Sequence, residues 1–299
     1  MMEINGGTRL TGLIGSDIVN SPSPALHNAA YEALGMNWAY LPLRVRPGRL
    51  KRALEGLRDA DFEGVNVTIP HKLEAAGLVD ELRGDARALS TVNTVSFTET
   101  GTYGYNTDAA GLLRSLHEAG ITSVTSVFMI GAGGAARAAA LALSRLGAGT
   151  LHIFNRSPER AGEFMRLVKQ AGVFDEIYIQ EYNEIGARIL ADCSCVVNST
   201  PLARSERGEL PLDYGLFAAG QVVVDLGYLE DRSAFLREAE GRGALVLNGR
   251  PMLLYQAAEA FRVFTGLEPP IARMRQALEE ELMDYRSRAR SAGGRDGET

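Results

Sequence analysis

Cysteine, histidine and tryptophan are scarce in this chain, and basic residues are not in excess. Its 299 residues include two cysteines, four histidines and one tryptophan. Cys193 and Cys195 lie directly before an apolar pair, so we expect buried strand residues there and neither a disulfide nor a metal site. The 31 basic and 37 acidic residues give a net charge of -6, which argues against nucleic acid as a partner.

Long apolar runs are missing as well. Charged residues interrupt every apolar stretch within the span that a membrane helix needs, as Arg137 and Arg145 do in the alanine-rich segment. The first residues lack the basic region and the apolar run of a signal peptide. We therefore expect a soluble, cytoplasmic protein with no membrane partner.

A glycine turn organises the rest of the chain. Residues 127–130 are apolar and β-branched, and residues 135–146 are mostly Ala and Leu, with Gly147 as the expected C-cap. The turn between them is Gly131-Ala132-Gly133-Gly134-Ala135. A helix that opens on such a turn directs N–H groups and the positive end of its dipole at a ligand above it, which suits a pyrophosphate.

The end of the next strand indicates which dinucleotide binds. An NAD site usually carries an acidic residue here, but residues 151–154 are followed by Asn155-Arg156-Ser157, with Arg160 close behind. Two cations beside a hydroxyl suit a 2′-phosphate, so we expect NADP. The alternative is a structural turn with two solvated arginines.

Strand and helix patterns alternate through the chain, which predicts an α/β protein with two domains. We expect a substrate domain over residues 1–113 and a doubly wound, Rossmann-type NADP domain over residues 114–250. Helices within residues 251–285 should return to the first domain and form a hinge. Residues 286–299 are polar and expected to be disordered.

Polar side chains stand where the strands of the first domain end, the side on which α/β sheets bind ligands. They are Ser21, Ser23, Asn66, Thr68, Lys72, Asn93, Asn106 and Asp108. Taken singly, each has a structural explanation: Ser23 can cap a helix, Lys72 can be a solvated surface residue, and Asp108 can cap the helix that follows it.

Eight motifs in order carry a resemblance to a known family. They are Ser21-Pro22-Ser23-Pro24-x-x-His27-Asn28, Asn66-Val67-Thr68-Ile69-Pro70-x-Lys72, Val92-Asn93-Thr94, Asn106-Thr107-Asp108, Gly131 to Arg137, Asn155-Arg156-Ser157, Asn198-Ser199-Thr200-Pro201 and Met252-Leu253-Leu254-x-Gln256-Ala257. The chain resembles the shikimate dehydrogenases over nearly its whole length. The resemblance implies reversible reduction of 3-dehydroshikimate to shikimate with NADPH, as a monomer or homodimer.

The resemblance also assigns site residues. It implies that Ser21 and Ser23 bind the substrate carboxylate, that Asn66, Thr68, Asn93 and Gln256 contact the substrate, and that Thr200, Gly249 and Met252 join the cofactor site. It marks Lys72 and Asp108 as the catalytic pair. A lysine is ordinarily protonated at pH 7 and can donate to the alkoxide that ketone reduction creates, while Asp108 would orient it and keep it charged.

Some positions depart from the family pattern: Asp17, Asn20, Ala203, the pair Ser233-Ala234, and Pro251 in Gly249-Arg250-Pro251-Met252. They leave open a divergent paralogue that oxidises quinate or an aminoshikimate-type analogue. A methylene-tetrahydrofolate dehydrogenase is a second alternative, although the serine pair speaks against it. An inactive NADP(H)-binding module is the non-enzymatic alternative, although Lys72 and Asp108 are both present.

Overall fold

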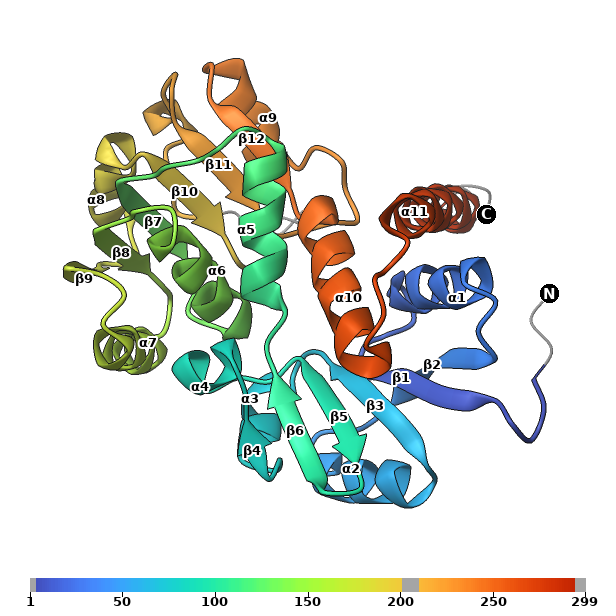
Figure 1. Ribbon diagram of the computed structural model, residues 1–299. Helices are drawn as coiled ribbons and strands as arrows, with labels where there is room; N and C mark the ends of the chain where they lie inside the picture. Colours follow the sequence, from blue (N-terminus) through green and yellow to red (C-terminus); the bar gives the residue numbers. More distant parts are fainter. Residues whose placement is uncertain (1–3, 201–209, 294–299) are drawn as a thin grey trace, which may run out of the picture. The chain divides into compact units, whose positions relative to one another are not determined.

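The structure, a computed structural model, describes residues 4–200 and 210–293, with side chains through Arg288. The chain forms two compact units, Met1–Thr107 with Ala257–Thr299 and Asp108–Gln256. Each unit contains one six-stranded sheet, so the predicted α/β class with two domains is confirmed (Figure 1). None of the helices in the described ranges is long and apolar enough to cross a membrane.

The second unit has a doubly wound parallel sheet. Its strands lie in the order β12 (Leu245–Asn248), β11 (Val222–Asp225), β10 (Cys195–Asn198), β7 (Ser126–Ile130), β8 (Thr150–Phe154) and β9 (Glu176–Gln180). Its helices are α5 (Asp108–Glu118), α6 (Gly134–Ser144), α7 (Pro158–Ala171), α8 (Glu184–Ala187), η1 (Arg188–Asp192), η3 (Tyr214–Leu216) and α9 (Ala234–Gly241). The strand order reverses between β7 and β10, and ligands of such sheets bind at that point.

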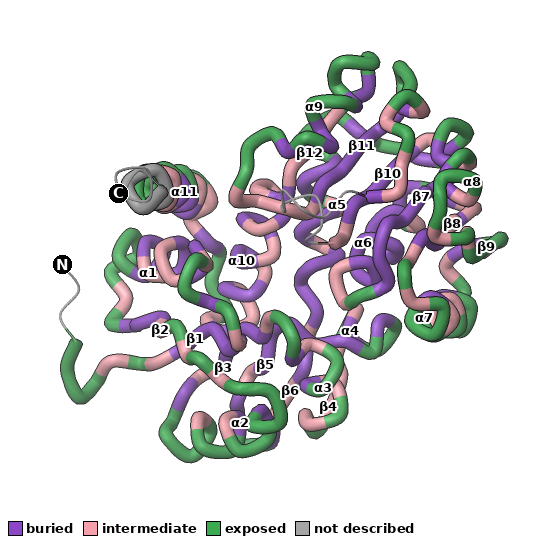
Figure 2. Tube along the Cα trace, turned by 180° about the vertical axis from the view of Figure 1, so that it is seen from behind, coloured by how far each residue is buried: buried purple, intermediate pink, exposed green. Residues whose placement is uncertain are grey.

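The first unit has a mixed sheet. Its strands lie in the order β2 (Trp38–Arg44), β1 (Arg9–Gly15), β3 (Phe62–Val67), β5 (Thr94–Thr98), β6 (Gly101–Tyr105) and β4 (Glu81–Leu82), and β5 runs antiparallel to both neighbours. Its helices are α1 (Ser23–Ala33), α2 (Leu50–Asp59), α3 (Lys72–Ala76), α4 (Asp85–Leu89), the end of α10 (Arg250–Thr265) and α11 (Ile271–Gly293). Figure 2 shows that the central strands of both sheets are buried.

Helix α11 and the part of α10 from Ala257 onward belong to the first unit, in which α11 packs along α1. Helix α11 nevertheless runs to Gly293, so the prediction of disorder from Arg286 is wrong for residues 286–293. Arginine and alanine are good helix formers, and Arg288 pairs with Glu281 two turns earlier at 2.7 Å. Residues 294–299 lie outside the described residues.

Two helix ends differ from expectation. The N-cap of α1 is Pro22, and Ser23 is already helical with no side-chain cap bond. Helix α6 ends two residues early with Arg145 at its C-cap, so Gly147, at φ +90°, turns the chain beyond the helix end. In both cases the preferences of the residues located the helix end to within two positions but named the wrong cap residue.

The two cysteines are buried and free, which confirms the main part of the expectation for them. Cys195 begins β10 and Cys193 lies just before it, so only one of the two is a strand residue. Burial raises the pKa of the Cys193 thiol to about 12 and raises that of the Cys195 thiol further. Both side chains therefore pack as small apolar groups.

His27 is the most deeply buried ionisable group of α1. Its ring stacks on Tyr40 with centroids 4.3 Å apart, and Phe264 of α10 packs beside it. It is fully buried, and within the described part of the chain neither ring nitrogen has a hydrogen-bond partner. Burial lowers the pKa of His27 to about 3, which keeps the ring neutral.

A neutral buried histidine makes folding sensitive to acid. Below the ordinary pKa of 6.5 the unfolded chain binds a proton that folded His27 does not take up, so stability falls as the pH drops toward 3. Between pH of about 7.5 and pH of about 5, we expect the first unit to lose about 2 kcal/mol of unfolding free energy through His27.

Urea unfolding followed by the fluorescence of Trp38, the sole tryptophan and a residue of this unit, measures the loss. His27→Leu should remove this part of the pH dependence, whatever its effect on stability at neutral pH. His117→Leu, at an exposed position, should leave it intact. An unchanged pH dependence in His27→Leu would contradict the expectation.

Candidate active site

The glycine turn between β7 and α6 is shaped by close approach. Gly131 has φ +107°, and a side chain there would collide with Ser199 Oγ and lie 2.9 Å from Thr200 Cγ2. Among the residues that the structure describes, a Cβ on Gly133 would meet no atom within 4 Å, and no side chain caps α6 at this residue. The first turn of α6 therefore faces open space, which fits a bound pyrophosphate.

A buried polar network fixes the end of β10 beside this turn. Asn198 accepts hydrogen bonds from the N–H and hydroxyl of Thr200, at 3.1 and 2.7 Å, and donates to Asp225 at 3.1 Å. Ser199 donates to the carbonyl of Ile130 at 2.7 Å. Thr200 is thus held next to the switch point of the sheet. Ala203, one of the departures, lies outside the described residues.

The departure at Ser233-Ala234 preserves the local bonding. The Ser233 hydroxyl donates to buried Asp225 at 2.7 Å and accepts from the N–H of Leu236 as the N-cap of α9. A threonine in this place would offer the same hydroxyl. Ala234 occupies the first helical position, where a proline would also be tolerated, so the exchange leaves the cap intact.

The end of β8 leads into an exposed helix N-terminus. Asn155 donates to the carbonyl of Ser157 at 2.8 Å, and the Ser157 hydroxyl caps α7 by accepting from the N–H of Arg160 at 3.3 Å. Arg156 and Arg160 are both exposed. A helix N-terminus with two accessible guanidinium groups can hold a phosphate dianion.

The segment after β12 carries a departure from the family pattern that the fold accommodates. A Cβ on Gly249 would collide with the backbone of Leu226, so glycine is required there. Arg250 donates to the carbonyl of Tyr228 at 3.0 Å and pairs with Asp231 at 2.7 Å. Pro251 lies in the first turn of α10, where its missing N–H removes no helical bond. Met252 is buried in the core of the unit.

The first unit contains a second buried network, here called the Asn93 network: Tyr40, Asn66, Thr94, Asn93 and Thr107. The Tyr40 hydroxyl donates to Asn66 at 2.8 Å, and Asn66 donates to Thr94 at 2.9 Å and to the carbonyl of Asn93 at 3.2 Å. Thr94 donates to Asn93 at 2.9 Å, and the N–H of Thr107 donates to the same Asn93 oxygen at 2.9 Å. All five residues are buried.

The loops after β1 and β3 lie against each other. A Cβ on Gly15 would collide with the methyl group of Thr68 and would lie 2.6 Å from Ile18 Cγ2. The N–H of Ser21 donates to the carbonyl of Ile18, and the Ser21 hydroxyl donates to that of Ser23 at 3.3 Å. The carboxyl ends of two neighbouring strands thus gather the serine pair and Thr68 on one side of the sheet.

Residues 92–93 hold two backbone positions of the first unit. Lys72 begins α3, and its carbonyl accepts a hydrogen bond from the N–H of Val92 at 2.9 Å. Asn93 follows Val92 and accepts from the N–H of Thr107, the last residue of this stretch of the unit. The backbones at Lys72 and Thr107 are therefore each anchored to the segment 92–93.

Asp108 begins α5, which packs tightly against α10 within the second unit. A Cβ on Gly111 would lie 2.7 Å from the N atom of Gln256 and 2.9 Å from the carbonyl oxygen of Met252. The start of α5 and the Gln256 turn of α10 are therefore neighbours. Asn106, by contrast, uses its side chain locally, since it donates to the Thr91 hydroxyl at 2.8 Å.

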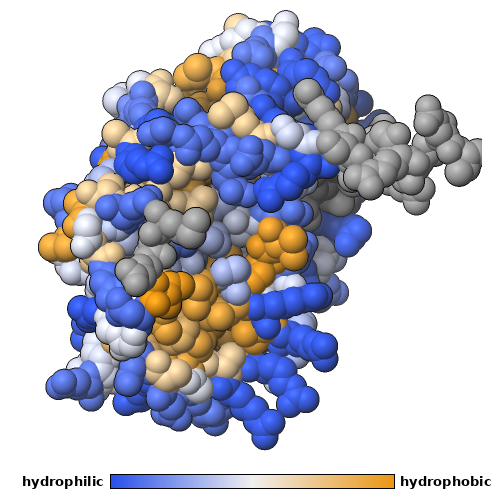
Figure 3. Space-filling model, turned by 90° about the vertical axis from the view of Figure 1, so that its right-hand side faces the viewer, coloured by the Kyte–Doolittle hydropathy of each residue, from blue (hydrophilic) through white to orange (hydrophobic). Residues whose placement is uncertain are grey.

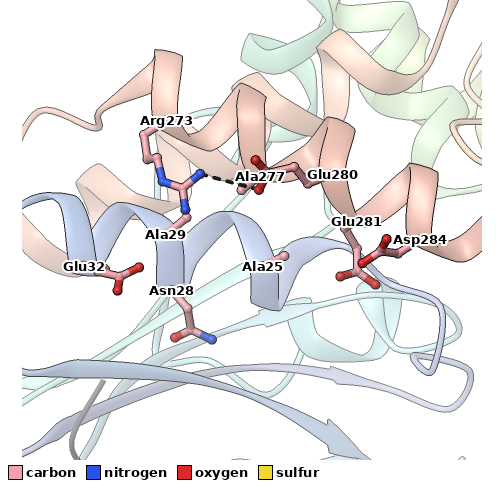
Figure 4. A pocket seen from close by; sticks show the side chains of 9 residues that line it. All are labelled: Ala25, Asn28, Ala29, Glu32, Arg273, Ala277, Glu280, Glu281 and Asp284. Carbon is pink, nitrogen blue, oxygen red and sulfur yellow. Dashed lines mark ion pairs between the residues drawn. The ribbon is translucent and has the colours of Figure 1, made fainter. Parts of the chain in front are cut away.

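A pocket between α1 and α11 is lined by none of the predicted site residues (Figure 4). Glu32, Glu280, Glu281 and Asp284 line it with Arg273, which pairs with Glu280 at 3.6 Å. Four carboxylates against one guanidinium leave an excess of negative charge. An anionic substrate would be repelled from this pocket.

The sequence interpretation missed the residues that hold the site together. Tyr40 and Asp225 make buried hydrogen bonds to predicted or motif residues but were not singled out, and Thr94 was named only as part of a motif. Asp225 offered a signal, because it ends an apolar strand as Asn198 does. Tyr40 offered none, since an aromatic residue in a strand normally indicates only packing.

Known proteins resemble the chain in sequence and in structure. Family models described as the shikimate dehydrogenase substrate binding domain and the shikimate 5'-dehydrogenase C-terminal domain match residues 13–95 and 249–279. A shikimate dehydrogenase (NADP(+)) of Methanothermobacter thermautotrophicus is 41% identical over 281 residues, which cover 93% of this chain and 99% of the relative.

Two solved structures add the three-dimensional comparison. A Thermus thermophilus shikimate 5-dehydrogenase in complex with NADP(H) and shikimate superposes with a TM-score of 0.79 at 32% identity, covering 91% of this chain and 99% of that one. A quinate dehydrogenase of Corynebacterium glutamicum in complex with NAD superposes with a TM-score of 0.84 at 31% identity, covering 91% and 99%. The chain belongs to the shikimate dehydrogenase family.

Proposed function

We propose that the protein is an oxidoreductase that reversibly reduces 3-dehydroshikimate to shikimate with NADPH. The observation that carries the proposal is the segment 92–93, which holds the backbone of Lys72 and that of Thr107, the residue before Asp108. The ketone gains a hydride at carbon and a proton at oxygen, and NADPH becomes NADP⁺. Bound NADPH supplies the hydride, so the protein must supply the proton.

The residues that would hold the cofactor fit its chemistry. The turn Gly131 to Ala135 and the first turn of α6 would receive the pyrophosphate, because Gly131 can have no side chain and Gly133 faces open space. Asn155, Arg156, Ser157 and Arg160 would bind the 2′-phosphate. Thr200, Gly249 and Met252 follow β10 and β12 of the same sheet and would border the nicotinamide end.

Lys72 would move the proton. An ammonium group donates to the oxygen that becomes an alkoxide as hydride arrives at the carbon, and in the reverse direction the neutral amine takes the proton back. Asp108 would orient the Lys72 ammonium group for this transfer.

The remaining first-unit residues would bind the substrate. The hydroxyls of Ser21 and Ser23 would donate to its carboxylate, and Thr68 and Asn93 would contact its ring hydroxyls, together with Gln256 of α10. Both amide hydrogens of Asn66 are already used within the Asn93 network. We therefore assign Asn66 a positioning role, with one oxygen lone pair left for substrate.

Quinate oxidation is not favoured, because the curated relatives that match the chain are named as NADP-dependent shikimate dehydrogenases. The test is to follow NADPH absorbance with shikimate or quinate, each with NADP⁺ and with NAD⁺. We expect fast turnover only with shikimate and NADP⁺. Faster turnover with quinate would overturn the substrate assignment.

Lys72→Met should lower kcat about 10²- to 10⁴-fold, the range expected when general acid catalysis is removed, with little change in NADP⁺ affinity. Steady-state kinetics and calorimetric titration of NADP⁺ measure the two quantities. Lys51→Met, on exposed α2, is the matched control and should keep wild-type kcat. Near-normal turnover in Lys72→Met would exclude it as the proton donor.

Arg156→Gln and Arg160→Gln should weaken NADP⁺ binding about 10- to 100-fold together, because each loses a charge-assisted bond to the 2′-phosphate. NAD⁺ lacks that phosphate, so its affinity should change less than about threefold. Calorimetric titration of both cofactors gives the comparison. Equal losses for the two would show that these arginines do not recognise the 2′-phosphate.

We further propose a cytoplasmic protein that is a monomer or a homodimer. Figure 3 shows an apolar patch among mostly hydrophilic side chains on one face of the molecule. Contiguous apolar surface is what a homodimer would bury. Light scattering during gel filtration decides between the two states.

A further inference from the structure

The N-terminus of α7 contains a carboxylate in an unexpected place for a site that binds phosphate. Glu159 is the second residue of α7 and is exposed, between the two arginines of the proposed 2′-phosphate site. Its Oε2 atom accepts a hydrogen bond from the Ser157 hydroxyl at 2.7 Å. This bond lowers the pKa of the Glu159 carboxyl, which is therefore ionised at neutral pH.

The Ser157 hydroxyl has only one proton to donate. It donates that proton to Glu159 and accepts from the N–H of Arg160, and the carbonyl of the same serine is held by Asn155. A phosphate oxygen bound at this hydroxyl would need the proton that Glu159 holds. The carboxylate and the phosphate therefore compete for one donor.

We infer that Glu159 acts as an internal competitor of the 2′-phosphate and weakens NADP binding without weakening NAD binding. The inference rests on the proposed cofactor site and names a residue that sets its specificity. When the phosphate binds, the Ser157 proton turns from the carboxylate to the phosphate. The carboxylate then remains, without this bond, beside a second anion.

NAD meets no such competition. Its ribose 2′-hydroxyl both donates and accepts, so it can bond to a carboxylate or to Ser157 without displacing an anionic partner. Glu159 therefore penalises NADP and spares NAD, in opposition to Arg156 and Arg160. The cofactor preference of the enzyme is the difference between these two effects.

The test measures dissociation constants of NADP⁺ and NAD⁺ by calorimetry on the full chain. Glu159→Gln removes the charge and keeps an acceptor for Ser157, whereas Glu159→Ala removes both. We expect each variant to bind NADP⁺ about fivefold more tightly and NAD⁺ within about twofold of wild type, as removal of a like charge from a solvated site predicts. Glu163→Gln, one turn further along α7, is the matched control for net charge and should change neither affinity by more than about twofold.

The Ser157→Ala background separates competition for the hydroxyl from general repulsion. If the two anions compete for its proton, Glu159→Ala, which removes the acceptor as well as the charge, should gain clearly less affinity for NADP⁺ in that background. The inference would be overturned if the gain in NADP⁺ affinity were undiminished in this background. It would also be overturned if NAD⁺ affinity rose equally, or if the gain did not exceed that of Glu163→Gln.

A wrong assignment of the cofactor site would give different results from a wrong role for Glu159. In that case wild type would not prefer NADP⁺, and the Arg156→Gln and Arg160→Gln variants would have no selective effect. If the wild type prefers NADP⁺, the arginine variants lose that preference and the Glu159 variants bind both cofactors as the wild type does, only the inference about Glu159 is overturned.

Discussion

The first unit depends on satisfying two buried amides at once. Asn66 and Asn93 are each less than one-tenth exposed, and a buried amide without partners is costly. Their partners come from β2, β5 and the segment after β6, so one arrangement of these strands satisfies both side chains. One of these bonds also holds the backbone of Thr107, which precedes the proposed proton-transfer residue Asp108, so the core and the proposed chemistry share one constraint.

The second unit depends on glycines at positions where backbone segments approach each other closely. Gly131 and Gly249 stand where a Cβ would strike the neighbouring strand ends, and Gly111 lets α5 approach α10. The resulting close backbone contacts need a rigid frame, which Asn198, Asp225 and Ser233 supply beneath the turn. Small residues at the turn and a polar network behind it together shape the proposed cofactor site.

The sequence predicts features whose causes are local, and it predicts less where partners are distant. The glycine turn, the two strands on either side of it and the basic residues after the second strand can be predicted because the motif that contains them spans only about thirty residues. The role of Tyr40 requires knowing that β2 and β3 both flank β1. Ser23 and Arg286 show a different limit: residue preference indicated a cap and a disordered tail, whereas α1 begins at Ser23 with Pro22 as its N-cap and α11 continues past Arg286.

The burial of Cys193 and Cys195 has a practical consequence for work on the protein. A thiol reacts as its thiolate, and both thiols are shielded from solvent and hold their protons well above neutral pH. The chain contains no other cysteine. A cysteine introduced at an exposed position would be the one reactive thiol of the folded protein, so spectroscopic probes can be attached at chosen points without first removing the native pair.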